Sequence, residues 1–304
     1  MKDGILLLVY VDEWIILSHS EARIDVLIRS FKNGKENRIL TDEGSIDKFL
    51  VISISKLDEN WYELAQTFLI GRIVELIESE CPTELNGKKS ITPVGKPLLH
   101  KDLMVVPRKY GWNYRTAVCM IGCLQQNARP EISMAYHQCA RFVNKSICGH
   151  ERAIIRIARY LRSTKERGVI FQTDPKLGLE CFVDADFSGC WSQADADNPD
   201  NVMSRTGYII RYDGCPIGWF SKLQTEISLI TAEAEYIALS PALRTFIPFM
   251  TLVEELSYIF PLYINKPYFH CKLFEDNQSC ISMTEYSNFS SRTKHISLKY
   301  HHFK

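Results

Sequence analysis

The chain has 304 residues, a length more typical of two domains than of one. It is 46% hydrophobic and 24% charged, the composition of an ordinary globular protein that can bury sizeable cores. Lys plus Arg and Asp plus Glu number 36 each, so the formal net charge is zero and any binding to a polyanion must come from local basic patches.

The opening residues carry no signal-peptide cleavage pattern, and their first apolar run, residues 5–9, is too short to span a bilayer. The ten cysteines are scattered and show no zinc-site spacing, so we interpret them as buried free thiols in a reducing compartment. We therefore expect a soluble intracellular protein, cytoplasmic or nuclear, with no membrane partner. The oligomeric state is left open.

The first hundred residues carry two hairpin signals. One joins two short apolar runs around Asp12 and Glu13, and the other has Asp58-Glu59-Asn60 at its tip. Residues 69–80 have the pattern of an amphipathic helix, and residues 82–101 contain three prolines and two glycines, as a linker does.

Three helices are predicted next, at residues 114–126, 130–144 and 151–163. One side of the third is apolar, and the other carries Arg152, Arg156 and Arg159. These arginines fit a solvated helix face, and they also fit a surface that rests on nucleic-acid phosphates.

From about residue 177 the pattern changes to strands. Residues 179–186 alternate so that Asp184 and Asp186 share a face, and Asp213-Gly214 is a strong hairpin signal between strands at 208–212 and 215–220. Thr231 is a suitable N-cap for a helix that carries Glu233 and Glu235. A strand at 269–274 and a helix at 279–284 follow, so the expected fold class is α/β, with a mixed sheet and helices packed on it.

Three acidic residues fall where such folds form ligand sites: Asp184 on the first strand, Glu235 near a helix start and Asp276 after a later strand. Any one of them alone is more typical of a helix-terminal charge or a solvated strand end than of a metal site. Together they would repel one another unless a hard cation such as Mg²⁺ or Mn²⁺ neutralised them. Two such ions can assist the displacement of a phosphodiester oxygen.

The sequence motifs around these acids are specific. They are FVDAD at 182–186, SRTGY at 204–208, GWFSKLQ at 218–224, TAEAEYIALS at 231–240, EDNQS at 275–279 and SRTKHI at 291–296. In this order they closely resemble the ribonuclease H domain of copia-type (Ty1/copia) retrotransposon Pol polyproteins. Upstream, YRTAV at 114–118, RPEI at 129–132 and RYL at 159–161 resemble the segment that joins polymerase to nuclease, and YVDE at 10–13 resembles the Tyr-Val-Asp-Asp hairpin of the polymerase palm.

The resemblance implies three regions. Residues 1–95 correspond to the C-terminal part of an α+β reverse transcriptase palm and thumb, 96–175 to a helical connection segment, and 176–304 to a ribonuclease-H-like domain that is truncated at its C-terminus. It also implies that Asp184, Glu235 and Asp276 are catalytic and hold Mg²⁺ or Mn²⁺. In the family a fourth acid follows a last sheet strand, and the chain stops at Lys304 before either.

The resemblance implies that the ancestral activities were RNA-directed DNA polymerisation and hydrolysis of RNA in RNA–DNA hybrids. Asp12 and Glu13 would be a relic of the polymerase site, since the family's second hairpin aspartate is replaced by Glu13 and the other palm aspartate is absent. We expect weak binding to RNA–DNA hybrid or other nucleic acid, and slow cleavage or none. The alternatives are a non-catalytic nucleic-acid-binding or interaction protein and a non-functional pseudogene product.

Overall fold

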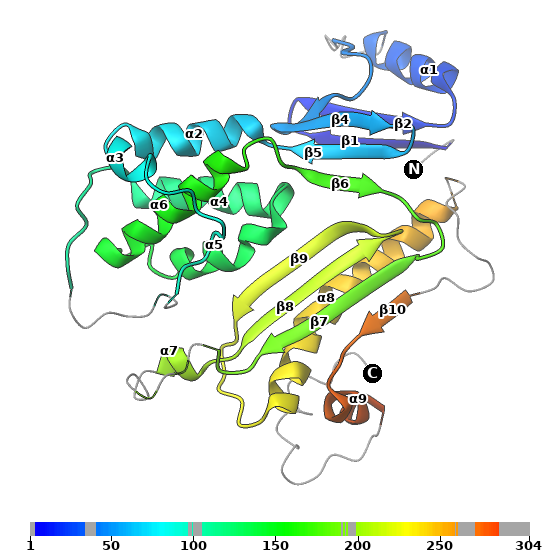
Figure 1. Cartoon of the computed structure of the whole chain (residues 1–304). Helices are drawn as coiled ribbons and strands as arrows, with labels where there is room; N and C mark the ends of the chain where they lie inside the picture. The colour runs from blue at the N-terminus through cyan, green and yellow to red at the C-terminus, as the bar shows by residue number, and fades with distance from the viewer. Residues whose placement is uncertain are drawn as a thin grey trace.

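The computed structural model describes residues 4–33, 41–96, 99, 105–189, 191, 193, 199–258, 260 and 271–285. The predicted motif at 291–296 and the end of the chain lie outside these ranges. The described part has an α/β fold with a hairpin, two four-stranded sheets and two hydrophobic cores, shown in Figure 1.

The predicted N-terminal hairpin is present. Strands β1 (Ile5–Tyr10) and β2 (Glu13–Ser18) pair antiparallel, and α1 (Glu21–Lys32) follows them. Val11 has a positive φ of 51° in the tight turn between the strands. Helix α1 has no buried residue, and Trp14 packs edge-on against Phe31 with ring centroids 5.2 Å apart. This unit therefore buries little apolar surface within the part of the chain that is described.

The first four-stranded sheet confirms the second predicted hairpin and adds a strand that the sequence pattern missed. Its order is β3-β4-β5-β6, all antiparallel. Strand β6 lies more than a hundred residues downstream of β5, and Gly168 before it passes so close to Leu64 that a Cβ would clash with the Leu64 carbonyl oxygen. The bounds are β3 Lys48–Phe49, β4 Ile52–Asp58, β5 Trp61–Ala65 and β6 Val169–Gln172.

A helical core follows this sheet. The predicted helices at 69–80, 114–126 and 151–163 are confirmed within a few residues, whereas the one predicted at 130–144 is a 3-10 turn, η1, followed by a helix that ends at Ala140. The side chain of Asn113 accepts a hydrogen bond from the Thr116 backbone amide and so caps the helix that starts at Tyr114. The bounds are α2 Thr67–Glu78, α3 Pro82–Leu85, α4 Tyr114–Asn127, η1 Pro130–Ile132, α5 Ser133–Ala140 and α6 Cys148–Ser163.

The apolar faces of α2, α4 and α6 meet in this core, which includes Ile73, Ile121 and Ile154 at zero exposure. It therefore contains side chains from both sides of the predicted boundary at residues 95 and 96, which remains a prediction. Nine cysteines are described and all are free thiols, as predicted, but Cys119 and Cys123 on α4 are exposed rather than buried. They lie on the side of α4 that does not pack into the core, although apolar residues flank them in the sequence.

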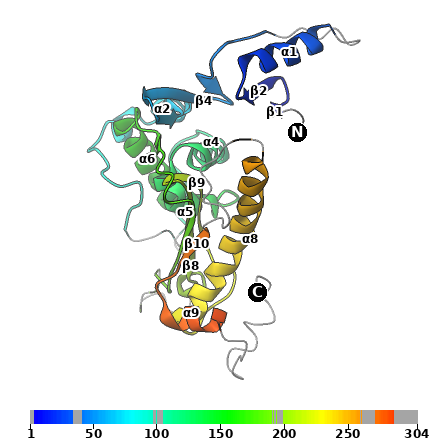
Figure 2. The same cartoon turned by 90° about the vertical axis from the view of Figure 1, so that its right-hand side faces the viewer.

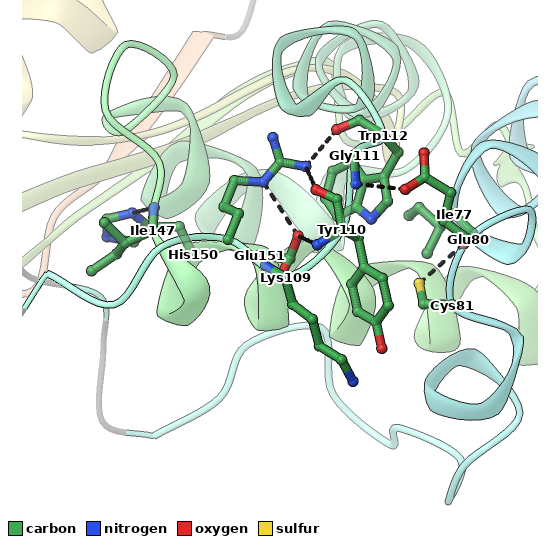
Figure 3. A network of polar contacts seen from close by, with 11 residues as sticks. Ile77, Glu80, Cys81, Lys109, Tyr110, Gly111, Trp112, Ile147, His150 and Glu151 are labelled. Atoms are coloured by element: carbon green, nitrogen blue, oxygen red, sulfur yellow. Dashed lines mark hydrogen bonds and ion pairs between the residues drawn. The ribbon is translucent and has the colours of Figure 1, made fainter.

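Glu151 organises the loop that enters this core, as Figure 3 shows. Its buried carboxylate accepts the backbone N–H groups of Lys109 and Tyr110, at 2.9 and 3.1 Å, and pairs with Arg108 at 3.3 Å. The Arg108 guanidinium also donates to the Trp112 carbonyl and lies 4.5 Å from the centre of the Trp112 ring. A charge buried with this many donors holds the loop in one conformation.

The second four-stranded sheet has the order β10-β7-β8-β9, with β10 parallel to β7 and the other pairs antiparallel. Asp213 and Gly214 join β8 to β9, and both have positive φ, as the predicted two-residue turn requires. Trp219 of β9 donates to the Gln125 carbonyl at 2.6 Å and ties this sheet to α4. The bounds are β7 Leu179–Asp186, α7 Pro199–Val202, β8 Arg205–Tyr212, β9 Cys215–Leu223, α8 Thr231–Ser257, β10 Cys271–Phe274 and α9 Gln278–Glu285.

Helix α8 covers one face of the second sheet, as Figures 1 and 2 show. By length and composition alone it is apolar enough to cross a membrane, but buried side chains such as Tyr236 and Phe246 pack on the sheet as in a core helix. Its N-cap is Ile230 rather than the predicted Thr231, because Thr231 already has helical conformation. Pro241 and Pro248 both lie inside the helix, which nevertheless continues to Ser257.

Candidate functional site

Three predicted acids meet at one end of the second sheet. Asp184 is near the carboxyl end of β7, Asp276 follows β10, and Glu235 is in the second turn of α8, whose N-terminal end lies at the same end of the sheet in Figure 1. Each offers a carboxylate oxygen, and these oxygens all lie within 4.8 Å of one another. The structure therefore brings together all three carboxylates that the resemblance singles out.

Strand register explains why Asp184 and Asp276 are neighbours. Phe182 pairs with Phe274 across the parallel β7–β10 ladder, and their rings stack with centroids 4.5 Å apart. Asp184 comes two residues after Phe182 and shares its face of β7, and Asp276 comes two residues after Phe274, just beyond the end of β10. Both are exposed, because α8 covers the opposite face, where Val183 and Ala185 are buried.

Glu235 reaches the same site from inside. Its side chain is only 6% exposed and accepts a hydrogen bond from the Ala185 backbone amide. Its Oε2 atom is buried without a hydrogen-bond partner among the residues that the structure describes. Burial raises its pKa to about 8, and the negative charges of Glu275, Asp184 and Asp276 add to this effect. A buried carboxylate with an unpartnered oxygen is costly unless a proton or a cation is present.

The donor set fits a hard divalent cation. Carboxylate oxygens alone form the group, without sulfur or imidazole, and such ligands suit Mg²⁺ or Mn²⁺. The unpartnered Glu235 oxygen is the atom that a bound ion would satisfy. The residues present therefore match the ion that the resemblance implies.

The pKa of Glu235 predicts how the stability of the metal-free protein depends on pH. The folded protein holds this proton up to about pH 8, whereas the unfolded chain releases it near the ordinary value of 4.5. Between these values the native state binds more protons, so the free energy of unfolding is expected to fall as pH rises through this window.

Chemical denaturation in EDTA at several pH values measures this effect. Glu235→Gln, which cannot ionise, is expected to remove the decline, whereas Glu255→Gln at an exposed position late in α8 is expected to keep it. A wild-type slope no different from that of Glu235→Gln would show that the buried carboxyl is not coupled to folding.

The other predicted site residues lie elsewhere. Asp12 sits in the two-residue turn of the β1–β2 hairpin, and Glu13 starts β2 and accepts a hydrogen bond from the Leu50 backbone amide at 2.9 Å. Neither belongs to a group of three or more potential ligands among the described residues. The hairpin acids are therefore separate from the three-carboxylate group, and their role as a polymerase relic stays a prediction.

The three arginines of α6 differ in their surroundings. Arg156 donates to the carbonyl and hydroxyl oxygens of Thr92 at 3.2 and 3.0 Å, and Arg159 donates to the Glu84 carbonyl at 2.5 Å. Arg152 is exposed. Two of these side chains therefore fasten residues 84–92 onto α6, a role that helical spacing did not reveal.

Pattern reasoning missed one acid near the cluster. Glu275, next to Asp276, is half-buried, and its Oε2 atom is also buried without a partner. Glu275 lies just beyond the end of a four-residue strand, where sequence alternation does not show which face a side chain occupies. Asp186, which shares a face with Asp184, is not part of the three-carboxylate group.

Known proteins of similar sequence include transposon proteins. The retrovirus-related Pol polyprotein from transposon TNT 1-94 of Nicotiana tabacum is 29% identical over 303 residues, 98% of this chain and 21% of that protein. The corresponding polyprotein from transposon RE1 of Arabidopsis thaliana is 25% identical over 307 residues, 99% of this chain and 19% of that protein. The chain thus spans about a fifth of the length of these relatives.

A shorter relative carries a different name. Secreted RxLR effector protein 161 of Plasmopara viticola is 31% identical over 129 residues, 42% of this chain and 85% of that protein. No protein-family model matches the chain. Because the two Pol polyproteins match it over nearly its whole length, the chain belongs to the copia-type, retrovirus-related Pol polyproteins of transposons.

Proposed function

We propose that this Pol-derived chain hydrolyses the RNA strand of RNA–DNA hybrids with the help of divalent cations bound by Asp184, Glu235 and Asp276. The observation that supports this most directly is the convergence of the three carboxylates around the unpartnered oxygen of Glu235. The resemblance to ribonuclease H domains supplies the substrate class. A contact to the RNA 2′-hydroxyl would distinguish the two backbones of the hybrid.

The three side chains have different tasks in this proposal. Asp184 and Asp276 are exposed, so they face the solvent from which a phosphodiester would approach. Glu235 is buried and accepts a hydrogen bond from the Ala185 amide, so it would hold an ion from the buried side of the site. When bound, Mg²⁺ or Mn²⁺ lowers the pKa of a coordinated water and stabilises the leaving oxygen.

Nucleic-acid binding in this proposal depends on local basic groups, since the chain has no net charge. Arg152 is exposed on α6 and is available for a phosphate, whereas Arg156 and Arg159 would have to share their donors with Thr92 and Glu84. We propose that such contacts make binding weak and salt-dependent. We do not propose polymerase activity, because Asp12 and Glu13 have no third acid beside them among the described residues.

A cleavage assay tests the proposal. The purified chain is incubated with a duplex whose RNA strand is labelled, in Mg²⁺, in Mn²⁺ and in EDTA, beside DNA–DNA and RNA–RNA duplexes of the same sequence. We expect slow cleavage of the hybrid RNA that requires a divalent cation. Cleavage that is equal in EDTA, or that does not distinguish the hybrid from the other duplexes, would contradict the proposal.

The second candidate is a non-catalytic nucleic-acid-binding or interaction protein. It is favoured by the relative that has a related sequence but is named as a secreted effector rather than as a polyprotein. Under this reading the hybrid is retained in a gel-shift experiment but its RNA strand stays intact in Mg²⁺ and in Mn²⁺. The same two assays therefore separate the candidates.

A further inference from the structure

A pocket of about 680 Å³ lies beside α6 in the helical part of the molecule. Its walls come from α5, from α6 and from the segment before α4 that includes residues 93–96. No residue that lines this α6 pocket belongs to the three-carboxylate group. Its volume falls within the range of roughly 300–1,000 Å³ that is typical of small-molecule sites.

The α6 pocket is lined by four cationic side chains, Lys96, Arg152, Arg156 and Arg159. The three arginines are four and three residues apart on α6, so they share one face of the helix. None of the four cations forms an ion pair within the part of the chain that the structure describes. Like charges gathered at one concave surface repel one another unless an anion is bound between them.

The acid that lines the α6 pocket does not neutralise these cations. It is Glu84, and no other Asp or Glu is among the described lining residues. Its Oε1 atom accepts the Tyr110 hydroxyl at 2.7 Å and lies 3.4 Å from the Lys109 ammonium. Because this carboxylate already has its own cation, the α6 pocket keeps an excess of positive charge.

The fold uses only some of the donors of the three arginines. Arg156 donates from Nε and Nη2 to Thr92, and Arg159 donates from Nε to the Glu84 carbonyl. Arg152 is exposed and makes no hydrogen bond with any described residue. A guanidinium has more N–H donors than these contacts occupy, so all three arginines keep donors for a ligand.

The rest of the wall is largely apolar. Val94, Leu99 and Ala153 are half-buried and line the α6 pocket. Gly95 and Gly149 also line it and leave space because they have no side chain. The apolar part of a ligand would leave water here, which favours binding in addition to the charge.

We propose that the α6 pocket binds a small molecule that carries a phosphate group on an aromatic or apolar body. The planar, forked donors of arginine match phosphate oxygens in pairs. A cluster of several cations suits a phosphate monoester better than a carboxylate, because the monoester carries more than one negative charge at neutral pH. The inference goes beyond the proposed function and requires none of the three carboxylates.

Equilibrium dialysis of the full chain tests the inference, with adenosine 5′-monophosphate (AMP) as the probe beside adenosine and inorganic phosphate. We expect AMP to bind about tenfold more tightly than either, because only AMP offers both the anion and the aromatic body. AMP affinity is expected to fall as salt rises, since the cations are partly exposed. Adenosine or phosphate binding as tightly as AMP would overturn the inference, as would no binding of AMP.

Arg152→Gln removes a cation of the α6 pocket, and AMP affinity is expected to fall about tenfold with the loss of one charge-assisted hydrogen bond. The matched control is Arg167→Gln, since Arg167 is an exposed arginine after α6 that does not line the pocket. The control is expected to bind AMP as wild type does. Equal losses of affinity in the two variants would assign the effect to net charge and overturn the inference.

Gly149→Leu tests the location of the site. A Cβ at Gly149 would have no heavy atom within 4 Å beyond its own chain neighbours and helix backbone, so the larger side chain fits without a clash. Leucine also has a higher helix propensity than glycine, so thermal unfolding is expected to show no loss of stability. The added side chain occupies part of the α6 pocket and is expected to weaken AMP binding. Unchanged AMP affinity in a folded Gly149→Leu protein would show that AMP binds elsewhere.

Discussion

Replacing Asp184 by asparagine is expected to reduce cleavage of the hybrid's RNA strand by about a thousandfold and to weaken Mn²⁺ binding. Asparagine keeps the size of the side chain but removes a charge from a group whose oxygens lie within 4.8 Å of those of Glu235 and Asp276. A metal-assisted displacement gains several kcal/mol from charge stabilisation, and a loss of about 4 kcal/mol corresponds to a thousandfold in rate. The exposure of Asp184 makes a large change in folding stability unexpected.

The matched control for this variant is Asp25→Asn. Asp25 is also exposed, but it is on α1, at the opposite end of the molecule from the acidic cluster in Figure 1. Cleavage and Mn²⁺ binding are measured for both variants beside wild type. If Asp184→Asn cleaves as fast as Asp25→Asn, the hydrolysis does not take place at this cluster.

Replacing Glu151 by alanine is expected to destabilise the protein by about 3–5 kcal/mol, the range for removing one partner of a buried charge pair. The change leaves Arg108 without its carboxylate partner and leaves the Lys109 and Tyr110 amides without their acceptor. These groups hold the loop before α4, so the substitution removes the contacts that position this loop against the helical core. Urea unfolding, followed by circular dichroism, measures the difference.

Two further variants make this result specific. Glu151→Gln keeps one acceptor oxygen but no charge, and is expected to lose about 2 kcal/mol, since hydrogen bonds to a charged group are worth more than neutral ones. Glu166→Gln, an exposed neighbour after α6, is expected to change stability by less than about 0.5 kcal/mol. Equal stabilities of Glu151→Ala and Glu166→Gln would show that the network around Glu151 does not support the fold.

The sequence by itself determined the elements whose signals are local. The alternation in residues 179–186 predicted β7 to the residue, and the Asp213-Gly214 turn predicted the β8–β9 hairpin, because both depend on neighbours along the chain. The motifs around Asp184, Glu235 and Asp276, taken in their order along the chain, also identified the three acids and the family. These signals need no knowledge of which segments meet in space.

Only the tertiary structure decided the features that depend on distant contacts. Strand β6 was missed because its pairing partner, β5, lies more than a hundred residues upstream, and its four residues carry too little pattern of their own. Helical spacing leaves Arg156 and Arg159 compatible with a solvated face or with a phosphate-binding surface, and only the tertiary structure shows that Thr92 and Glu84 accept their hydrogen bonds. The partial burial of Glu275 has the same physical origin: it arises only when distant segments pack together, and no spacing along the chain encodes it.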